Sequence, residues 1–61
     1  MGNNLRKQRN KLNLTQVEVA RRAKTPYRSY QDYETGRCVP NVYTAIKLAS
    51  ILKTTVEELF S

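Results

Sequence analysis

A chain of 61 residues with one cysteine, Cys38, and no histidine has to fold without covalent or metal staples. It can form no intramolecular disulfide and no His/Cys metal site. A domain this small buries only about 60% of the surface that its unfolded chain exposes. Its stability must come from apolar packing, which favours a bundle of short helices with mostly local contacts. We expect residues 1–61 to form one such domain, with no metal and no cofactor.

Signals for the start of short helices recur along the chain, and no alternation typical of a strand persists. Thr15 and Glu18 have the spacing of a capping box, as do Thr55 and Glu58. Asn13 and Gly36 suit the left-handed turns that end helices. The pattern predicts an all-α fold of five short helices, with N-caps at Asn3 or Asn4, Thr15, Thr25, Asn41 and Thr55.

Apolar spacing along these segments predicts the faces that pack together. In the first helix, Leu5, Gln8, Arg9 and Leu12 share one arc. The other residues expected inside are Val19, Ala20, Ala23, Tyr30, Tyr33, Val42, Ala45, Ile46, Ala49, Leu52, Val56, Leu59 and Phe60.

The charge of the chain is +6 and is unevenly distributed. Residues 1–47 hold ten bases and three acids, whereas residues 48–61 hold one base and two acids. A field of one sign indicates an anionic partner, either nucleic acid or a membrane surface. The start of the chain lacks the apolar run of a signal peptide, and no stretch has transmembrane length. We therefore expect a cytoplasmic protein.

Two predicted helices, residues 16–23 and 26–35, are separated by a very short turn, so that the second projects from the first. On the second helix, Tyr30 and Tyr33 point one way, while Arg28, Gln31 and Asp32 point the other. Tyr27 lies on the flank. Arg can donate two bonds to guanine, Gln can pair with adenine, and Asp can accept from cytosine. This side of helix 26–35 is suited to reading the major groove of DNA.

The run Leu14-Thr15-Gln16-x-x-x-Ala20, followed by Tyr33-Glu34-x-Gly36 and Pro40, resembles the Cro/CI-type helix-turn-helix of phage repressors and related regulators. The resemblance covers almost the whole chain. It implies a five-helix lambda-repressor-like fold, operator DNA as the ligand, and a dimer.

Position by position, the resemblance implies two sets of DNA contacts. Base reading falls to Tyr27, Arg28 and Asp32, with Gln31 adjacent. Phosphate binding falls to Gln16, Arg37 and Asn41, and we expect Thr15 and Thr25 to bind phosphate as well. Arg9 and Glu34 match a structural ion pair of the family, and the helical wheel independently places Arg9 on an apolar arc where it needs a partner.

The sequence also departs from the family pattern. Lys24 and Lys53 stand where glycine usually follows a helix, Pro26 replaces a small polar residue, and Gln8 occupies a position normally held by leucine. These changes weaken the caps and the core, so we expect modest stability.

Several alternatives stay open at this point. Tyr27 either contacts the groove or covers Pro26, and Asp32 either contacts a base, pairs with Arg28 or repels a phosphate. A membrane-surface peptide is disfavoured because the bases are scattered over several helices. An enzyme is disfavoured because there is no histidine, nucleophile–base pair or phosphate loop. An interaction module, such as an antitoxin or an anti-repressor partner, is the remaining rival.

The favoured function is that of a repressor that binds an inverted-repeat operator as a homodimer. Ile51 lies away from the predicted core arc of the fourth helix, with Leu48 beside it. We expect these residues and Phe60 to form the dimer surface, with the Cys38–Val39 loop as a possible addition, unless Ile51 is a lone exposed apolar residue. The chain ends after the fifth helix, so we expect no domain that senses a small-molecule effector.

Overall fold

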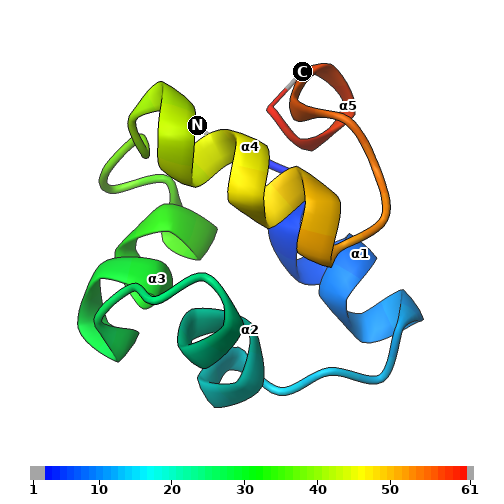
Figure 1. The fold of residues 1–61 in the computed structure, drawn as a ribbon, viewed down its shortest axis with the longest axis horizontal. Coiled ribbons are helices and arrows are strands. Elements are labelled where there is room, and N and C mark those ends of the chain that lie inside the picture. The colour runs from blue at the N-terminus through cyan, green and yellow to red at the C-terminus, as the bar shows by residue number, and fades with distance from the viewer. Residues whose placement is uncertain (1–2, 61) are drawn as a thin grey trace.

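The computed structural model describes residues 3–60 and arranges them as a bundle of helices (Figure 1). The elements are α1 (Leu5–Lys11), α2 (Gln16–Arg22), α3 (Tyr27–Thr35), α4 (Val42–Ile51) and α5 (Val56–Leu59). No strand occurs between residues 3 and 60, which confirms the predicted all-α fold. Met1, Gly2 and Ser61, which belong to the expected domain, lie outside the described residues.

At three of the predicted N-caps, the side chain of the N-cap residue accepts from the third amide of its helix. The Thr15 hydroxyl accepts from the Glu18 amide, and the Glu18 side chain accepts from the Thr15 amide, so α2 begins with a complete capping box. Asn41 Oδ1 accepts from the Thr44 amide at 2.9 Å, and Thr55 Oγ1 accepts from the Glu58 amide at 3.1 Å. Each cap satisfies a backbone donor that the first helical turn leaves unpaired.

The predicted cap at Thr25 is wrong. The N-cap residue of α3 is Pro26, and the helix begins one residue later than expected, at Tyr27. The Thr25 hydroxyl instead donates to the Ala23 carbonyl at 3.1 Å. That carbonyl lies at the end of α2, where no backbone amide of the helix is available to it. The Thr25 hydroxyl therefore donates to this carbonyl and does not cap α3. At the start of α1, Asn3 Oδ1 accepts from the Leu5 amide, while Asn4 occupies the N-cap position.

Two lysines adopt the left-handed backbone conformation that favours glycine. Lys24 has φ of 52° and Lys53 has φ of 54°, after the ends of α2 and α4. Asn13 and Gly36 have positive φ as predicted. A side chain with a Cβ atom costs about 1–2 kcal/mol in this conformation, so both lysines store backbone strain.

Replacing Lys53 by glycine should therefore stabilise the domain by up to about 1 kcal/mol, because relieved strain exceeds the added flexibility of the unfolded chain. Urea denaturation measures the change. Lys47→Gly is the matched control, since Lys47 lies inside α4 and glycine there should cost about 1 kcal/mol. Destabilisation by both substitutions would contradict the strain at Lys53.

The core collects one or two apolar side chains from every helix. Tyr30 is fully buried and Tyr33 packs against the core from its edge, as predicted. The core cluster consists of Leu5, Val19, Ala20, Ala23, Tyr30, Leu48, Ala49, Leu52 and Leu59.

The predicted inner face of α4 is partly wrong. Val42 is 70% exposed and Ile46 is 55% exposed, whereas Leu48 is fully buried. Ile51 is half-buried and packs against the core cluster. Because α4 carries apolar residues on nearly every side, its own sequence does not define one inner face, and packing against α2 and α5 decides it. Leu48 therefore cannot belong to a surface that meets a partner.

Gln8, at the leucine-like position of α1, makes a specific polar contact with the end of α4. Its Nε2 donates at 2.9 Å to the carbonyl of Leu52, and Leu52 is the C-cap residue of α4. The two ends of the described chain are also joined, since the Asn4 amide donates to the Leu59 carbonyl at 2.9 Å. Gln8 thus satisfies a terminal carbonyl that leucine would leave to water.

Candidate nucleic-acid interface

Helices α2 and α3 pack against each other across a tight turn (Figure 1). The Thr25 amide donates to the Ala20 carbonyl at 2.9 Å, and Lys24 makes the left-handed bend. The inner side of α3 contributes Tyr30 and Glu34 to the interior. Its other side is therefore the part of this helix pair that a ligand can reach.

The four residues predicted to read bases lie together on this outer side of α3. Tyr27 and Arg28 are exposed, and Gln31 and Asp32 are half-buried. Residues four apart on a helix lie one above the other, so Arg28 and Asp32 are neighbours. Within residues 3–60, no ion pair joins them. In the free protein, Asp32 and Arg28 therefore do not form a salt bridge with each other.

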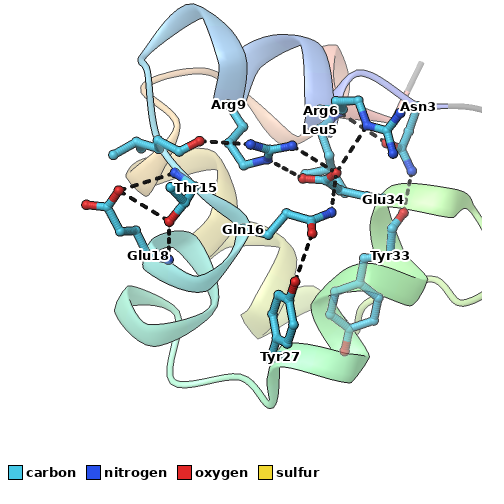
Figure 2. A network of polar contacts seen from close by, with 11 residues as sticks. Asn3, Leu5, Arg6, Arg9, Thr15, Gln16, Glu18, Tyr27, Tyr33 and Glu34 are labelled. Atoms are coloured by element: carbon cyan, nitrogen blue, oxygen red, sulfur yellow. Dashed lines mark hydrogen bonds and ion pairs between the residues drawn. The ribbon is translucent and has the colours of Figure 1, made fainter.

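The predicted Arg9–Glu34 ion pair is present and ties α1 to α3 (Figure 2). Arg9 Nε donates to Glu34 Oε2 at 2.6 Å, and a second Arg9 nitrogen donates to Oε1 at 3.4 Å. The side chain of Glu34 is 0% exposed and that of Arg9 is 12% exposed. Arg9 also donates to the Leu14 carbonyl at 2.8 Å, which fixes the segment that precedes α2.

Gln16 extends this network to the start of α3. Its Nε2 donates to Glu34 Oε1 at 3.0 Å, and its Oε1 accepts from the Tyr27 hydroxyl at 3.2 Å. Figure 2 shows the Gln16 side chain between Glu34 and Tyr27. These two contacts fix which way the amide faces. An amide nitrogen has two hydrogens, and one remains for a ligand.

The network keeps Glu34 ionised. Burial alone would raise the pKa of this carboxyl group, but hydrogen bonds from Arg9 and Gln16 outweigh burial and lower its pKa below the ordinary value. The pKa of Arg9 is raised by its hydrogen bond to Glu34. Burial raises the pKa of Tyr30, whose hydroxyl lies near Glu34 but meets hydrogen-bond geometry with no described group. Tyr30 therefore stays neutral beside the Arg9–Glu34 ion pair.

The other residues predicted to bind phosphate lie at helix ends. Thr15 and Asn41 are exposed, with the Thr15 hydroxyl and Asn41 Oδ1 engaged as caps. Thr25 is half-buried. Arg37 is exposed after the left-handed Gly36, and its amide donates to the Asp32 carbonyl at 2.9 Å. The first residues of the α3–α4 loop, residues 36–41, are thus held by their backbone against the end of α3.

Sequence reasoning missed one charged residue of this site, Arg6. Its Nε lies 3.5 Å from Glu34 Oε1, and its side chain is 65% exposed. The available signal was its spacing, because Arg6 precedes Arg9 by three residues and such residues lie on neighbouring parts of a helix. Glu34 therefore faces two guanidinium groups, one largely covered and one exposed.

Within residues 3–60, no helix is long and apolar enough to cross a bilayer. The same part of the chain has no group of three or more His, Cys, Asp or Glu side chains placed to hold a metal ion.

Comparison with known proteins agrees with this geometry. A search of curated proteins gave no match. A model of the family described as helix-turn-helix matches residues 5–59, which span all five helices. The five-helix arrangement is that of the lambda-repressor-like fold. The chain belongs to the Cro/CI-like helix-turn-helix family of DNA-binding regulators.

Proposed function

We propose that this chain is a cytoplasmic transcriptional repressor that inserts α3 into the major groove of an inverted-repeat operator. The observation that carries the proposal is the outer side of α3, where Tyr27 and Arg28 are exposed beside the half-buried Gln31 and Asp32. An α-helix fits the major groove, and side chains of these types match base edges there.

Each of these side chains has a base partner that its chemistry favours. Arg28 donates two bonds to guanine, Gln31 pairs with adenine, and Asp32 accepts from the amino group of cytosine. Asp32 is not engaged by Arg28 in the free protein, so both are available for this role. Tyr27 contacts the groove with the edge of its ring while its hydroxyl bonds Gln16.

Phosphate contacts on both sides of α3 set its register on the duplex. Gln16, Thr15 and Thr25 act from the α2 side of the helix pair. Arg37 and Asn41 act from the α3–α4 loop. The net charge of +6 supports this assignment, because counterion release from DNA needs an excess of bases.

Binding should be specific for duplex DNA and should weaken steeply with salt. If each subunit neutralises about five phosphates, a plot of log affinity against log salt should have a slope of about −4 to −5 per subunit. Fluorescence anisotropy with duplexes selected from a random pool measures this slope, and the separated strands serve as the control. A slope near zero would refute the proposal, and the interaction module would become the better description.

The dimer surface that we propose differs from the one expected from the sequence. Leu48 is buried and Ile51 packs on the core, but an apolar groove opens on another side of α4. Its lining residues are Val39, Pro40, Val42, Ala45, Ile46, Val56 and Phe60. Val39 and Phe60 belong to both surfaces.

A second copy of this chain is the occupant that we assign to the groove. Val39, Val42 and Ile46 are large apolar side chains that are more than half exposed, and such a patch marks an interaction site. Val39 lies in the same loop as Arg37. Two copies that meet through this patch share one two-fold axis close to the DNA. Their α3 helices then reach half-sites about 34–36 Å apart.

Ile46→Glu should lower affinity for the full inverted repeat at least about tenfold, or 1.4 kcal/mol, while affinity for a single half-site stays unchanged. The charge would be placed inside the interface, where it is costly. Ser50→Glu is the matched control, because it makes the same kind of change at an exposed position of α4. Footprinting on full and half sites measures both variants. Equal losses for the two variants would exclude the groove as the interface.

A further inference from the structure

Around Glu34 the charges do not balance. One carboxylate faces two guanidinium groups, those of Arg9 and Arg6. Arg9 is only 12% exposed and makes the short contact of 2.6 Å, so it neutralises the carboxylate. Arg6, at 65% exposure, approaches only to 3.5 Å and brings a second positive charge that faces solvent. The cluster therefore has a surplus charge on its open side.

The surplus charge lies next to the amide of Gln16. The Glu34 Oε1 atom is 3.0 Å from Gln16 Nε2 and 3.5 Å from Arg6 Nε. Both nitrogens contact the same oxygen atom, so their separation is at most the sum of these two distances. Figure 2 shows Arg6 from α1 and Gln16 from α2 converging on Glu34. The Glu34 carboxylate thus holds Gln16 by a hydrogen bond and attracts Arg6 by its charge, which brings the two side chains to one place.

Both donors retain hydrogens for another acceptor. Arg6 approaches Glu34 through Nε, which leaves the two terminal nitrogens of its guanidinium. Gln16 gives one amide hydrogen to Glu34, and the Tyr27 hydroxyl bonds its oxygen, so the amide cannot reverse without losing both contacts. An acceptor that satisfies both donors needs two oxygens close together and a negative charge. A DNA phosphate has two such oxygens.

We propose that Arg6 and Gln16 together clamp a single backbone phosphate, with Glu34 and Tyr27 as positioning residues. This inference rests on the proposed function, since the phosphate belongs to the duplex that α3 reads. It adds α1 to the DNA-binding surface, which would otherwise comprise only α2, α3 and the α3–α4 loop. The clamp does not distinguish one base sequence from another. It fixes the position of α3 in the major groove.

The test compares Arg6→Ala with Lys7→Ala on one selected duplex. Lys7 is the matched control because it is the next residue of α1, is exposed and has the same charge. Arg6→Ala should reduce affinity about tenfold and reduce the magnitude of the salt slope by about 0.9, the value for one phosphate. Lys7→Ala should change the slope much less. Base preference in a selection experiment should be the same for both variants.

A methylphosphonate scan identifies the phosphate itself. Neutralising the clamped phosphate should weaken the wild-type protein about tenfold and weaken Arg6→Ala much less, because only Gln16 then remains to contact it, whereas other positions should weaken both proteins alike. Thermal unfolding serves as the folding check. Arg6→Ala should melt close to the wild-type temperature, since an exposed ion pair contributes little to stability.

The outcomes separate the clamp from the function on which it rests. If wild-type protein binds duplex DNA with the expected salt slope and Arg6→Ala does the same, Arg6 is an ordinary surface ion pair and the clamp is refuted. If no methylphosphonate position distinguishes the two proteins, the clamp is likewise refuted. If wild-type protein shows no salt-dependent duplex binding, the proposed function fails and the clamp fails with it.

Discussion

Replacing Glu34 by alanine should destabilise the domain by about 3–5 kcal/mol, the usual loss when one partner of a buried ion pair is removed. The Glu34 side chain is 0% exposed, and its loss strands the Arg9 guanidinium, which is only 12% exposed. A domain of 61 residues has a total stability of roughly 3–9 kcal/mol. The substitution should therefore remove most of the stability, and urea denaturation by circular dichroism measures the loss.

Two further variants assign this loss to the stranded charge. Glu34→Gln keeps the shape of the side chain but leaves Arg9 unpaired, so it should be nearly as damaging as alanine. The double replacement Arg9→Met with Glu34→Leu removes both charges and should cost much less. Glu57→Ala, at an exposed position of α5, is the control for loss of an acid. A loss below about 1 kcal/mol for Glu34→Ala would show that the pair behaves like a surface ion pair.

The same pair gives the stability a defined dependence on pH. The folded-state pKa of Glu34 lies below the ordinary value of 4.5, which applies to the unfolded chain. The contribution of this ionised carboxylate is then complete above the ordinary pKa and is lost as the pH falls through the folded-state pKa. The stability difference between wild type and Glu34→Ala should consequently shrink on acidification and stay constant around neutral pH.

Arg28→Ala should weaken binding to the selected operator by about 1–3 kcal/mol, or roughly 5- to 150-fold, and relax the preference at one base pair. Arg28 is exposed on the outer side of α3 and has no ion pair within residues 3–60, so its removal should leave the fold intact. Affinity measurements on the operator and on single-base variants of it report both effects.

Gln16→Ala should behave differently, because Gln16 is assigned to a phosphate. It should weaken binding to all duplexes alike and leave the base preference unchanged. Arg21→Ala removes an exposed base near the opposite end of α2 and controls for net charge. A changed base preference in Gln16→Ala would contradict its phosphate assignment, and an unchanged preference in Arg28→Ala would contradict its role in base reading.

Features that depend on neighbouring residues were predictable from the sequence. The capping box of Thr15 and Glu18 and the left-handed turn at Asn13 each involve residues only a few positions apart. Residues this close settle their own geometry with little influence from the rest of the fold. The Arg9–Glu34 pair was also predictable, because a charge on an apolar arc demands a partner.

Features that depend on the packing of several helices were not predictable. Sequence periodicity placed Val42 and Ile46 inside and Leu48 at the surface, but α4 is apolar on most sides and its neighbours select the buried face. The bond from Gln8 to the Leu52 carbonyl joins positions 44 apart, so a residue expected to weaken the core makes a specific contact. The base-reading and phosphate assignments remain predictions, since they concern a complex with DNA.

The contact between the two ends of the described chain bears on the order of folding. The Asn4 side chain donates to the Glu58 carbonyl at 2.8 Å across 54 positions. The backbone amide of Asn4 donates to the carbonyl of the next residue, Leu59. Closing so large a loop costs chain entropy, which grows with the logarithm of loop length. Helices α2 and α3 pack across only a few residues and can associate earlier at lower cost. The helix pair assigned to DNA would then assemble first, and the joining of α1 to α5 would complete the domain around it.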